Sequence, residues 1–128
     1  MIYVDSSVAL AHLLVEPRSP PASLWNGPVV SSQLLEYEVW NRIHAYGLGR
    51  SHANEAQALL MRMDLIEMTA AVLARALEPF PSPIRTLDAL HLSTIEYVRN
   101  RREMVELASY DTHLCAAAQA LGISIAAL

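Results

Sequence analysis

The sequence contains no lysine, and all nine of its basic residues are arginine. Thirteen acidic residues bring the net charge to −4, which argues against a broad basic surface for nucleic acid. The single cysteine, Cys115, cannot form an internal disulfide and belongs to no Cys/His zinc pattern, so we expect a small buried residue of a helix. No apolar run approaches the roughly 18 residues that a membrane span needs. These absences argue against a disulfide scaffold, a zinc module and a membrane-spanning protein.

The abundant residues are apolar: hydrophobic residues make up 53% of the chain and charged residues only 17%. This composition excludes a disordered chain and indicates a large buried surface, part of it against a partner. A length of 128 residues predicts one domain, residues 1–128, with its own core. The N-terminal apolar run is interrupted at Asp5, unlike a signal peptide, so we expect a cytoplasmic protein.

Short apolar runs alternate with helical patterns along the whole chain, which predicts βα units around a parallel sheet. The expected strands are Ile2–Val4, Pro28–Ser31, Leu65–Met68, Val105–Ser109 and Ile123–Ile125. The expected helices are Ser6–Val15, Ser32–Tyr46, one that begins at the N-cap Ser51, Thr69–Leu77, Thr86–Arg99 and one that includes Leu114 to Leu121. In such a sheet the strand ends and the helix starts meet at one edge, where ligands bind.

Four carboxylates are expected at that edge of the sheet. Asp5 follows the first strand and Asp111 the fourth, while Glu38 and Asp88 lie near the starts of two helices. Carboxylates beside apolar segments are costly unless something offsets their charge. The four account for the whole net charge of −4, and two divalent ions would cancel them. Their convergence would therefore predict a metal site and metal-assisted hydrolysis of phosphodiester bonds.

Each carboxylate also has a purely structural interpretation. Asp5 and Asp111 could serve as N-caps of helices, and Asp88 could lie in the first turn of a helix. Either arrangement stabilises a helix by roughly 0.5–1 kcal/mol. Glu38 could pair with Arg42 one turn further along its helix. The metal site is favoured because apolar residues lie near Asp88 and Glu38 on their helices, and semi-buried carboxylates without basic neighbours are unusual unless a cation binds.

Several segments together carry a resemblance to a known family. The chain resembles the PIN-domain ribonucleases and, within them, the VapC-type toxins of bacterial toxin–antitoxin systems. The most specific signal is Leu-Asp-Ala-Leu-His-Leu with Ser-Tyr-Asp downstream of it, whereas Val-Asp-Ser alone is weak. The matching segments, in family order and spacing, are 1–7 (MIYVDSS), 31–39 (SSQLLEYEV), 85–92 (RTLDALHL), 109–114 (SYDTHL) and 118–123 (AQALGI).

The resemblance implies an α/β fold, a three-layer α/β/α sandwich with a central parallel sheet, and a metal-dependent endoribonuclease site. It also implies that water rather than the ribose 2′-hydroxyl attacks the phosphodiester. An all-oxygen site suits Mg²⁺ or Mn²⁺ as the cofactor. The acidic positions of the family, implied to be both catalytic and metal-binding, fall on Asp5, Glu38, Asp88 and Asp111.

The position of the site glutamate has two candidates. Glu38 is preferred over its rival Glu36 because the family pattern places a small apolar residue, here Val39, directly after the acid. The hydroxyl of Ser6 matches a Ser/Thr that the family often has beside the first aspartate, and Ser109 is a weaker accessory candidate of the same kind.

Two histidines lie close to the acids in sequence. His91 shares a helix face with Asp88 and could ligate metal or move a proton, but its apolar neighbours favour a packed, hydrogen-bonded residue. His113 follows Asp111 by two residues and could contact RNA.

The resemblance also implies partners: an RNA substrate, a second copy in a homodimer, and a VapB-type antitoxin whose basic side chain enters the acidic site. Trp25 and an apolar segment are either core or interface with such partners. The cluster 99–102 either binds RNA phosphate or complements a helix dipole. The apolar segment comprises Leu34, Leu35, Tyr37, Val39, Trp40 and Ile43.

Three other classes of protein compete with the nuclease. A catalytically silent PIN-fold interaction module is the first alternative, but all four acids are present. A phosphoacceptor receiver domain also gathers aspartates at strand ends but uses a lysine, which this chain lacks. A haloacid-dehalogenase-like phosphatase needs Asp-x-Asp after the first strand, where this chain has Asp-Ser-Ser. The sequence therefore predicts a nuclease whose RNA target is open.

Overall fold

A computed structural model describes residues 1–101 and 104–128 of the chain. In this part of the chain five parallel strands form one sheet in the order β3-β2-β1-β4-β5. Tyr3 of the central strand stands beside Val30 on one side and Leu107 on the other. The strands are β1 (Ile2–Val4), β2 (Val29–Ser32), β3 (Asp64–Ile66), β4 (Glu106–Ala108) and β5 (Ser124–Ile125).

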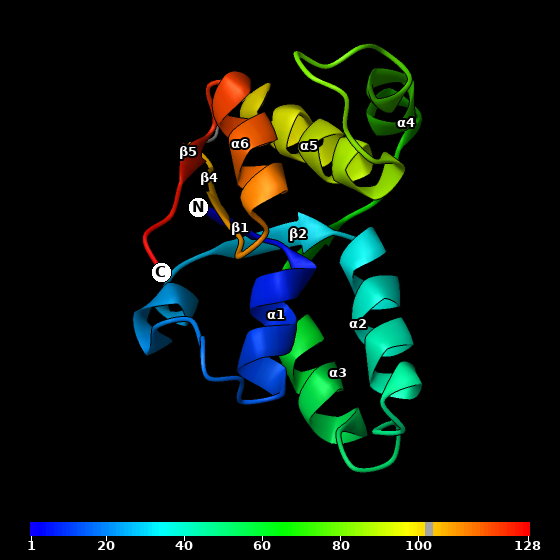
Figure 1. The fold of residues 1–128 in the computed structure, drawn as a ribbon, viewed down its shortest axis with the longest axis vertical. Coiled ribbons are helices and arrows are strands. Elements are labelled where there is room, and N and C mark those ends of the chain that lie inside the picture. Colours follow the sequence, from blue (N-terminus) through cyan, green and yellow to red (C-terminus); the bar gives the residue numbers. More distant parts are fainter. Residues whose placement is uncertain (102–103) are drawn as a thin grey trace.

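Helices cover both faces of this sheet. In Figure 1, α1, α2 and α3 lie on one side of it, and α4, α5 and α6 lie on the other. The helices are α1 (Ser6–Leu13), α2 (Leu34–Ala45), α3 (Ala53–Met61), α4 (Ala70–Ala76), α5 (Thr86–Arg99) and α6 (Thr112–Ala120), with a 3₁₀ helix, η1 (Ala22–Asn26), before β2. Each described helix is too short or too polar to cross a membrane.

The two layers of helices are held by two separate hydrophobic clusters, because alternate residues of a strand point to opposite faces. Val4 and Val29 belong to the cluster that α1, α2 and α3 complete. Tyr3, Val30 and Leu107 belong to the cluster that α5 and α6 complete. The predicted three-layer α/β/α sandwich is therefore confirmed.

The strand order contains one reversal of direction. The chain runs outward from β1 through β2 to β3, then crosses to β4 on the other side of β1 and continues to β5. The carboxyl ends of β1 and β4 therefore flank the switch point, where open α/β sheets bind ligands. Asp5 follows β1 directly, and residues 109–111 follow β4.

The element boundaries differ from the predicted ones by a few residues. Helix α5 occupies the predicted range, but α1 ends at Leu13 because the backbone leaves the helical region, with Val15 at φ +50°. The prediction of Ser51 as an N-cap was wrong: His52 precedes α3, and the Ser51 hydroxyl is hydrogen-bonded to its Nδ1. The 3₁₀ helix η1 was not predicted.

The segments considered as interfaces are largely core. Trp25 is only 8% exposed and packs in the cluster with α1, α2 and α3, so it belongs to the core. In α2 the side chains of Leu35, Val39 and Ile43 are fully buried, whereas Tyr37 is 64% exposed. Arg102, part of the arginine cluster considered for phosphate binding, lies outside the described residues. Cys115 is half-buried on α6, so it is more exposed than expected.

Candidate active site

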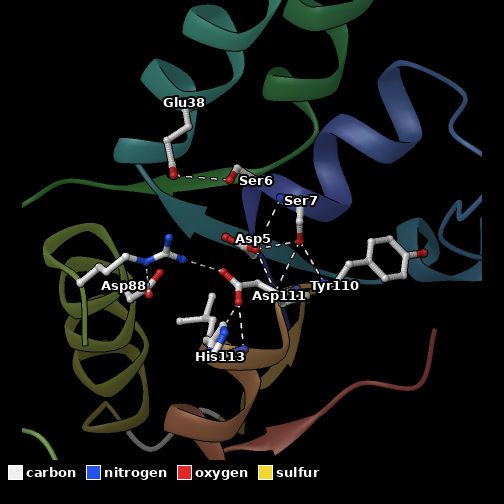
Figure 2. A network of polar contacts seen from close by, with 11 residues as sticks. Asp5, Ser6, Ser7, Glu38, Asp88, Tyr110, Asp111 and His113 are labelled. Carbon is white, nitrogen blue, oxygen red and sulfur yellow. Dashed lines mark hydrogen bonds and ion pairs between the residues drawn. The ribbon is translucent and has the colours of Figure 1, made fainter. Parts of the chain in front are cut away.

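The four predicted carboxylates line one cavity at the carboxyl edge of the sheet. The cavity has a volume of about 370 Å³ and includes Asp5, Glu38, Asp88 and Asp111 in its wall. Figure 2 shows their carboxyl groups pointing toward the same space from four elements of the fold. The rival glutamate, Glu36, lies in the first turn of α2 and is not part of this wall.

Asp5 is the most tightly held of the four. Its side chain is 5% exposed and N-caps α1, so the structural interpretation of this residue also applies. Its Oδ2 accepts hydrogen bonds from Ser7 Oγ at 2.8 Å, Ser109 Oγ at 2.9 Å and the Ser7 backbone N–H at 3.4 Å. Among the described residues, these three are all the hydrogen bonds that the Asp5 carboxylate accepts, and each of them goes to Oδ2. The other oxygen, Oδ1, is therefore the one available to a ligand.

Two serines tie the ends of β1 and β4 together around Asp5. The Tyr110 backbone N–H donates to Ser7 Oγ, and the Asp111 backbone N–H donates to Ser109 Oγ, both at 2.9 Å (Figure 2). Ser109 was predicted as an accessory residue, but Ser7 was missed. The signal for it was the serine doublet after Asp5, of which only Ser6 had been selected.

Glu38 is held from both of its oxygens. Ser6 Oγ donates to Glu38 Oε2 at 3.4 Å, and His91 Nε2 lies 2.6 Å from Glu38 Oε1. This geometry supports the interpretation of His91 as a packed, hydrogen-bonded residue, since its side chain is 2% exposed. Glu38 therefore does not rely on a pair with Arg42, whose guanidinium lies over the ring of Tyr46.

A buried chain of hydrogen bonds extends from His91 into the sheet. Tyr3 Oη lies 2.6 Å from His91 Nδ1 and accepts the Ser32 backbone N–H at 3.2 Å. Burial raises the pKa of the Tyr3 phenol, so it stays a neutral hydroxyl. Burial opposes protonation of His91, but the hydrogen bond and charge of Glu38 prevail and raise the histidine pKa. Two protonation states of His91 fit these partners, the imidazolium and the neutral ring with its proton on Nε2. In both of them Nε2–H donates to Glu38.

Asp88 and Asp111 are held differently, by one arginine. Arg85 Nε lies 3.5 Å from Asp88 Oδ2, and its Nη2 lies 3.4 Å from Asp111 Oδ2. The expectation that the acids lack basic neighbours was therefore wrong. Arg85 is the N-cap residue of α5 and stands three residues before Asp88, a spacing that favours such a pair and could have identified it. Asp111 also N-caps α6, as its structural interpretation required.

Negative charge at this site is only partly offset. Burial raises the pKa of the Asp88 carboxyl, and repulsion by Asp111 and Asp5 raises it further, while Arg85 lowers it. Carboxylates that repel one another in a shared cavity favour a bound cation.

The residues suit a divalent cation in chemistry, although their present arrangement is not a complete cage. Among the described residues no three His, Cys, Asp or Glu side chains lie close enough to hold a metal ion. In this arrangement Arg85 engages Asp88 and Asp111, and His91 engages Glu38. The donors are nevertheless all carboxylate oxygens, which Mg²⁺ and Mn²⁺ prefer, and Mg²⁺ keeps several waters rather than requiring a full protein cage.

Comparison with known proteins identifies the family of this chain. The family described as PIN domain matches residues 2–119. The chain belongs to the PIN domain family. This PIN domain is also similar to curated proteins of Mycobacterium tuberculosis along almost its whole length.

Three of these relatives carry closely related names. Ribonuclease VapC46 (strain ATCC 25618 / H37Rv) is 32% identical, with 98% of this chain and 96% of the relative covered. Ribonuclease VapC35 is 28% identical, with 99% and 96% covered, and Ribonuclease VapC47 is 26% identical, with 95% and 93% covered (both strain CDC 1551 / Oshkosh). The resemblance to VapC-type proteins is therefore confirmed.

Proposed function

We propose that this PIN domain is a metal-dependent endoribonuclease and the toxin of a type II toxin–antitoxin system. The observation that carries the proposal is the convergence of four carboxylates, from four separate elements, in one cavity at the switch point of the sheet. The full-length similarity to proteins named ribonuclease supplies the substrate class. The proposal assigns the activity to residues 1–128 acting as a single domain.

Asp5, Glu38, Asp88 and Asp111 would hold Mg²⁺ or Mn²⁺. When bound, such a cation supplies Lewis acidity and activates a water at neutral pH. Asp5 is the central residue because three hydrogen bonds fix its orientation. Asp111 is the most dispensable, since its carboxylate also caps a helix. With such a site no side chain is required as a general base.

The hydroxyl groups around the site are proposed to act by positioning. Ser109 and Ser7 hold one oxygen of Asp5, and Ser6 holds one oxygen of Glu38. Carboxylates locked in this way need little reorganisation when charge develops on the phosphate. Hydrolysis by water, rather than attack by the ribose 2′-hydroxyl, would leave 5′-phosphate and 3′-hydroxyl ends.

We propose the cytoplasm as the location and a VapB-type antitoxin as the inhibitor. The position of Arg85 supports inhibition by a basic side chain, because a guanidinium already fits between Asp88 and Asp111. A homodimer is supported by large apolar side chains that remain exposed, among them Leu77 at 89% and Leu73 at 45% on or next to α4, and Leu87 at 48% on α5.

A catalytically silent interaction module on the same fold is the alternative. The observation in its favour is that Arg85 already balances Asp88 and Asp111 without a metal. The two functions differ in a simple way: the module would bind partners without cutting RNA.

The test is cleavage of total bacterial RNA by the purified protein, free of antitoxin, in Mg²⁺ or Mn²⁺ and in EDTA. Asp5→Asn should abolish cleavage, whereas the matched control Asp64→Asn, at an exposed position of β3, should not. Discrete products with 5′-phosphate ends that disappear in EDTA would support the proposal. Cleavage that survives Asp5→Asn would contradict the site, and a folded protein that cuts no RNA would favour the silent module.

A further inference from the structure

Asp5 presents one oxygen to the acidic cavity and keeps the other within the protein. Its Oδ2 accepts hydrogen bonds from Ser7 Oγ, the Ser7 backbone N–H and Ser109 Oγ, while its Oδ1 accepts none from the part of the chain that the structure describes (Figure 2). Each oxygen of a carboxylate has about two lone-pair sites, so these donors fill Oδ2. Asp5 therefore offers a cation one oxygen, Oδ1.

Glu38 shows the same division between its two oxygens. Its Oε1 lies 2.6 Å from His91 Nε2, whereas its Oε2 accepts a 3.4 Å hydrogen bond from Ser6, a length at which water or an ion readily replaces the donor. The His91 ring cannot turn away from Oε1 without breaking a second contact, because its Nδ1 lies 2.6 Å from Tyr3 Oη and its side chain is 2% exposed. Tyr3 and His91 together therefore keep Oε1 occupied.

We propose that His91 is a positioning residue that sets the cation preference of the site: by occupying Oε1 it makes Glu38 a ligand through one oxygen, which disfavours Ca²⁺ relative to Mg²⁺ and Mn²⁺. Ser7 and Ser109 act on Asp5 in the same way. The inference rests on the proposed metal-dependent function and adds to it a basis for the choice of cation. It gives a role to the buried His91 ring, whose two nitrogens both face protein groups.

The sizes of the ions give the physical reason for this preference. Ca²⁺ binds about six to eight oxygens in flexible geometry and often takes both oxygens of one carboxylate. Mg²⁺ is smaller, requires nearly octahedral angles and keeps several of its waters. The two oxygens of a carboxylate lie too close together for two neighbouring octahedral positions around so small an ion. Carboxylates restricted to one oxygen therefore cost Mg²⁺ little, but they deprive Ca²⁺ of ligands.

The other two carboxylates contribute less to this preference. Asp111 already uses Oδ1 for the two backbone N–H groups that it caps at the start of α6. Arg85 pairs with Oδ2 of both Asp88 and Asp111, but its side chain is 75% exposed, so these pairs are screened by water and readily exchanged. The lasting restriction therefore comes from the buried donors on the other side of the cavity.

The test is the affinity of the protein, without RNA, for Mg²⁺, Mn²⁺ and Ca²⁺, measured by calorimetric titration and by the rise in unfolding temperature at constant ionic strength. His91→Leu frees Glu38 Oε1, whereas His91→Gln retains an N–H donor. His12→Leu is the matched control, at a histidine of α1 that does not line the acidic cavity.

A second pair of variants applies the same test to Asp5 and leaves His91 in place. Ser109→Ala removes one donor to Asp5 Oδ2. Ser93→Ala is its matched control, because Ser93 is an equally buried serine whose hydroxyl donates to a backbone carbonyl of α5 instead. The unfolding temperature of every variant without added cation shows whether it is folded.

We expect the ratio of Ca²⁺ affinity to Mg²⁺ affinity to rise about tenfold in His91→Leu, at the lower end of the changes that residues bonded to a metal ligand produce. His91→Gln should bring the ratio back toward that of the parent protein. Ser109→Ala should raise it by a smaller factor, because Ser7 still bonds Oδ2, and both controls should leave it unchanged. The ratio separates this role from a purely structural one, since a loosened fold or a lost charge on the histidine alters the affinity for two divalent ions alike.

The same ratio in the parent protein, His91→Leu and His91→Gln would overturn the inference. If His91→Leu does not fold, an unchanged ratio in Ser109→Ala would overturn it as well, and so would a parent protein that binds neither cation. The outcome is separable from that of the proposed function. Mg²⁺-dependent RNA cleavage with a ratio indifferent to residue 91 would keep the nuclease and reject the inference, whereas a ratio that depends on residue 91 in a protein that cuts no RNA would do the reverse.

Discussion

The two sides of the acidic cavity hold their carboxylates by opposite means. On one side, Glu38 is attached through His91 to Tyr3, two residues that are 1% and 0% exposed. On the other side, Asp88 and Asp111 share Arg85, whose side chain is 75% exposed. One side is built from hydrogen bonds to two buried residues, and the other from two ion pairs to one exposed arginine.

This difference separates the part of the site that is fixed from the part that can exchange partners. Breaking a buried hydrogen bond costs much free energy, because the donor and acceptor that remain unpaired cannot bond to water instead. An exposed ion pair is worth less than about 1 kcal/mol and is replaced readily by another ion. We therefore expect the Glu38 side to set the geometry of the cavity and the Arg85 side to admit a cation or a phosphate.

The largest effect is expected from breaking the buried side at His91. His91→Leu leaves the Tyr3 hydroxyl and the Glu38 carboxylate without their shared partner, and should lower the free energy of unfolding by about 2–4 kcal/mol. His91→Gln retains an N–H donor and should lose less. Denaturant unfolding of both variants measures the difference, and equal losses would show that the space filled by the ring matters more than its hydrogen bonds.

Tyr3→Phe tests the inner end of the same chain. It removes the hydroxyl that joins the Ser32 N–H to His91 while leaving the ring in place. One or two buried groups lose a partner, so unfolding should become easier by about 1–2 kcal/mol. RNA cleavage by the folded variant should fall as Glu38 becomes less well oriented, and unchanged kcat at full metal saturation would argue against a positioning role for the chain.

The sequence predicted the acids of this cavity better than their partners. Asp5, Glu38, Asp88 and Asp111 could be identified because residue type and motif spacing are local properties, and parallel βα units bring their positions to one edge. The Tyr3–His91 contact joins residues 88 positions apart, so no local pattern shows it. Arg85 lay inside a recognised segment and its spacing from Asp88 was a local signal, but its second partner, Asp111, became clear only from the placement of α5 against α6.

The boundaries of the elements show the same limit. Helix α5 was predicted to the residue because Pro83 and the apolar periodicity are local signals. The start of α3 was wrong by one residue, since the hydroxyl of Ser51 bonds the neighbouring His52 ring instead of the helix. A competing side-chain hydrogen bond, even between neighbouring residues, overrides such a propensity.

A smaller effect is expected at the junction of the two sides, where Ser7 supports Asp5. Ser7→Ala removes the donor to Asp5 Oδ2 and the acceptor of the Tyr110 N–H, and should reduce stability by about 1 kcal/mol. Ser6→Ala is the matched control one residue earlier: within residues 1–101 and 104–128 its hydroxyl makes one side-chain hydrogen bond, to Glu38 at 3.4 Å, so this variant should cost less stability. The order is checked by thermal unfolding of the two variants side by side, and the reverse order would contradict the network around Asp5.

The smallest effect on stability, and the most informative one, is expected from Arg85→Ala. Because the arginine is exposed, its removal should change the free energy of unfolding by less than about 0.5 kcal/mol, and the change should shrink further in 1 M salt. Among the described residues, Arg85 is the one basic side chain that forms an ion pair with Asp88 and Asp111. In the variant, a divalent ion therefore no longer competes with a guanidinium for these carboxylates. The rise in unfolding temperature on adding Mg²⁺ should therefore be larger for Arg85→Ala than for the parent protein.

The matched Arg50→Ala variant, at an exposed arginine between α2 and α3, should respond to Mg²⁺ as the parent does. A Mg²⁺ response that disappears in Arg85→Ala would mean that the arginine organises the open side of the cavity instead of exchanging with the ion, and the contrast between a fixed and an exchangeable side would fail.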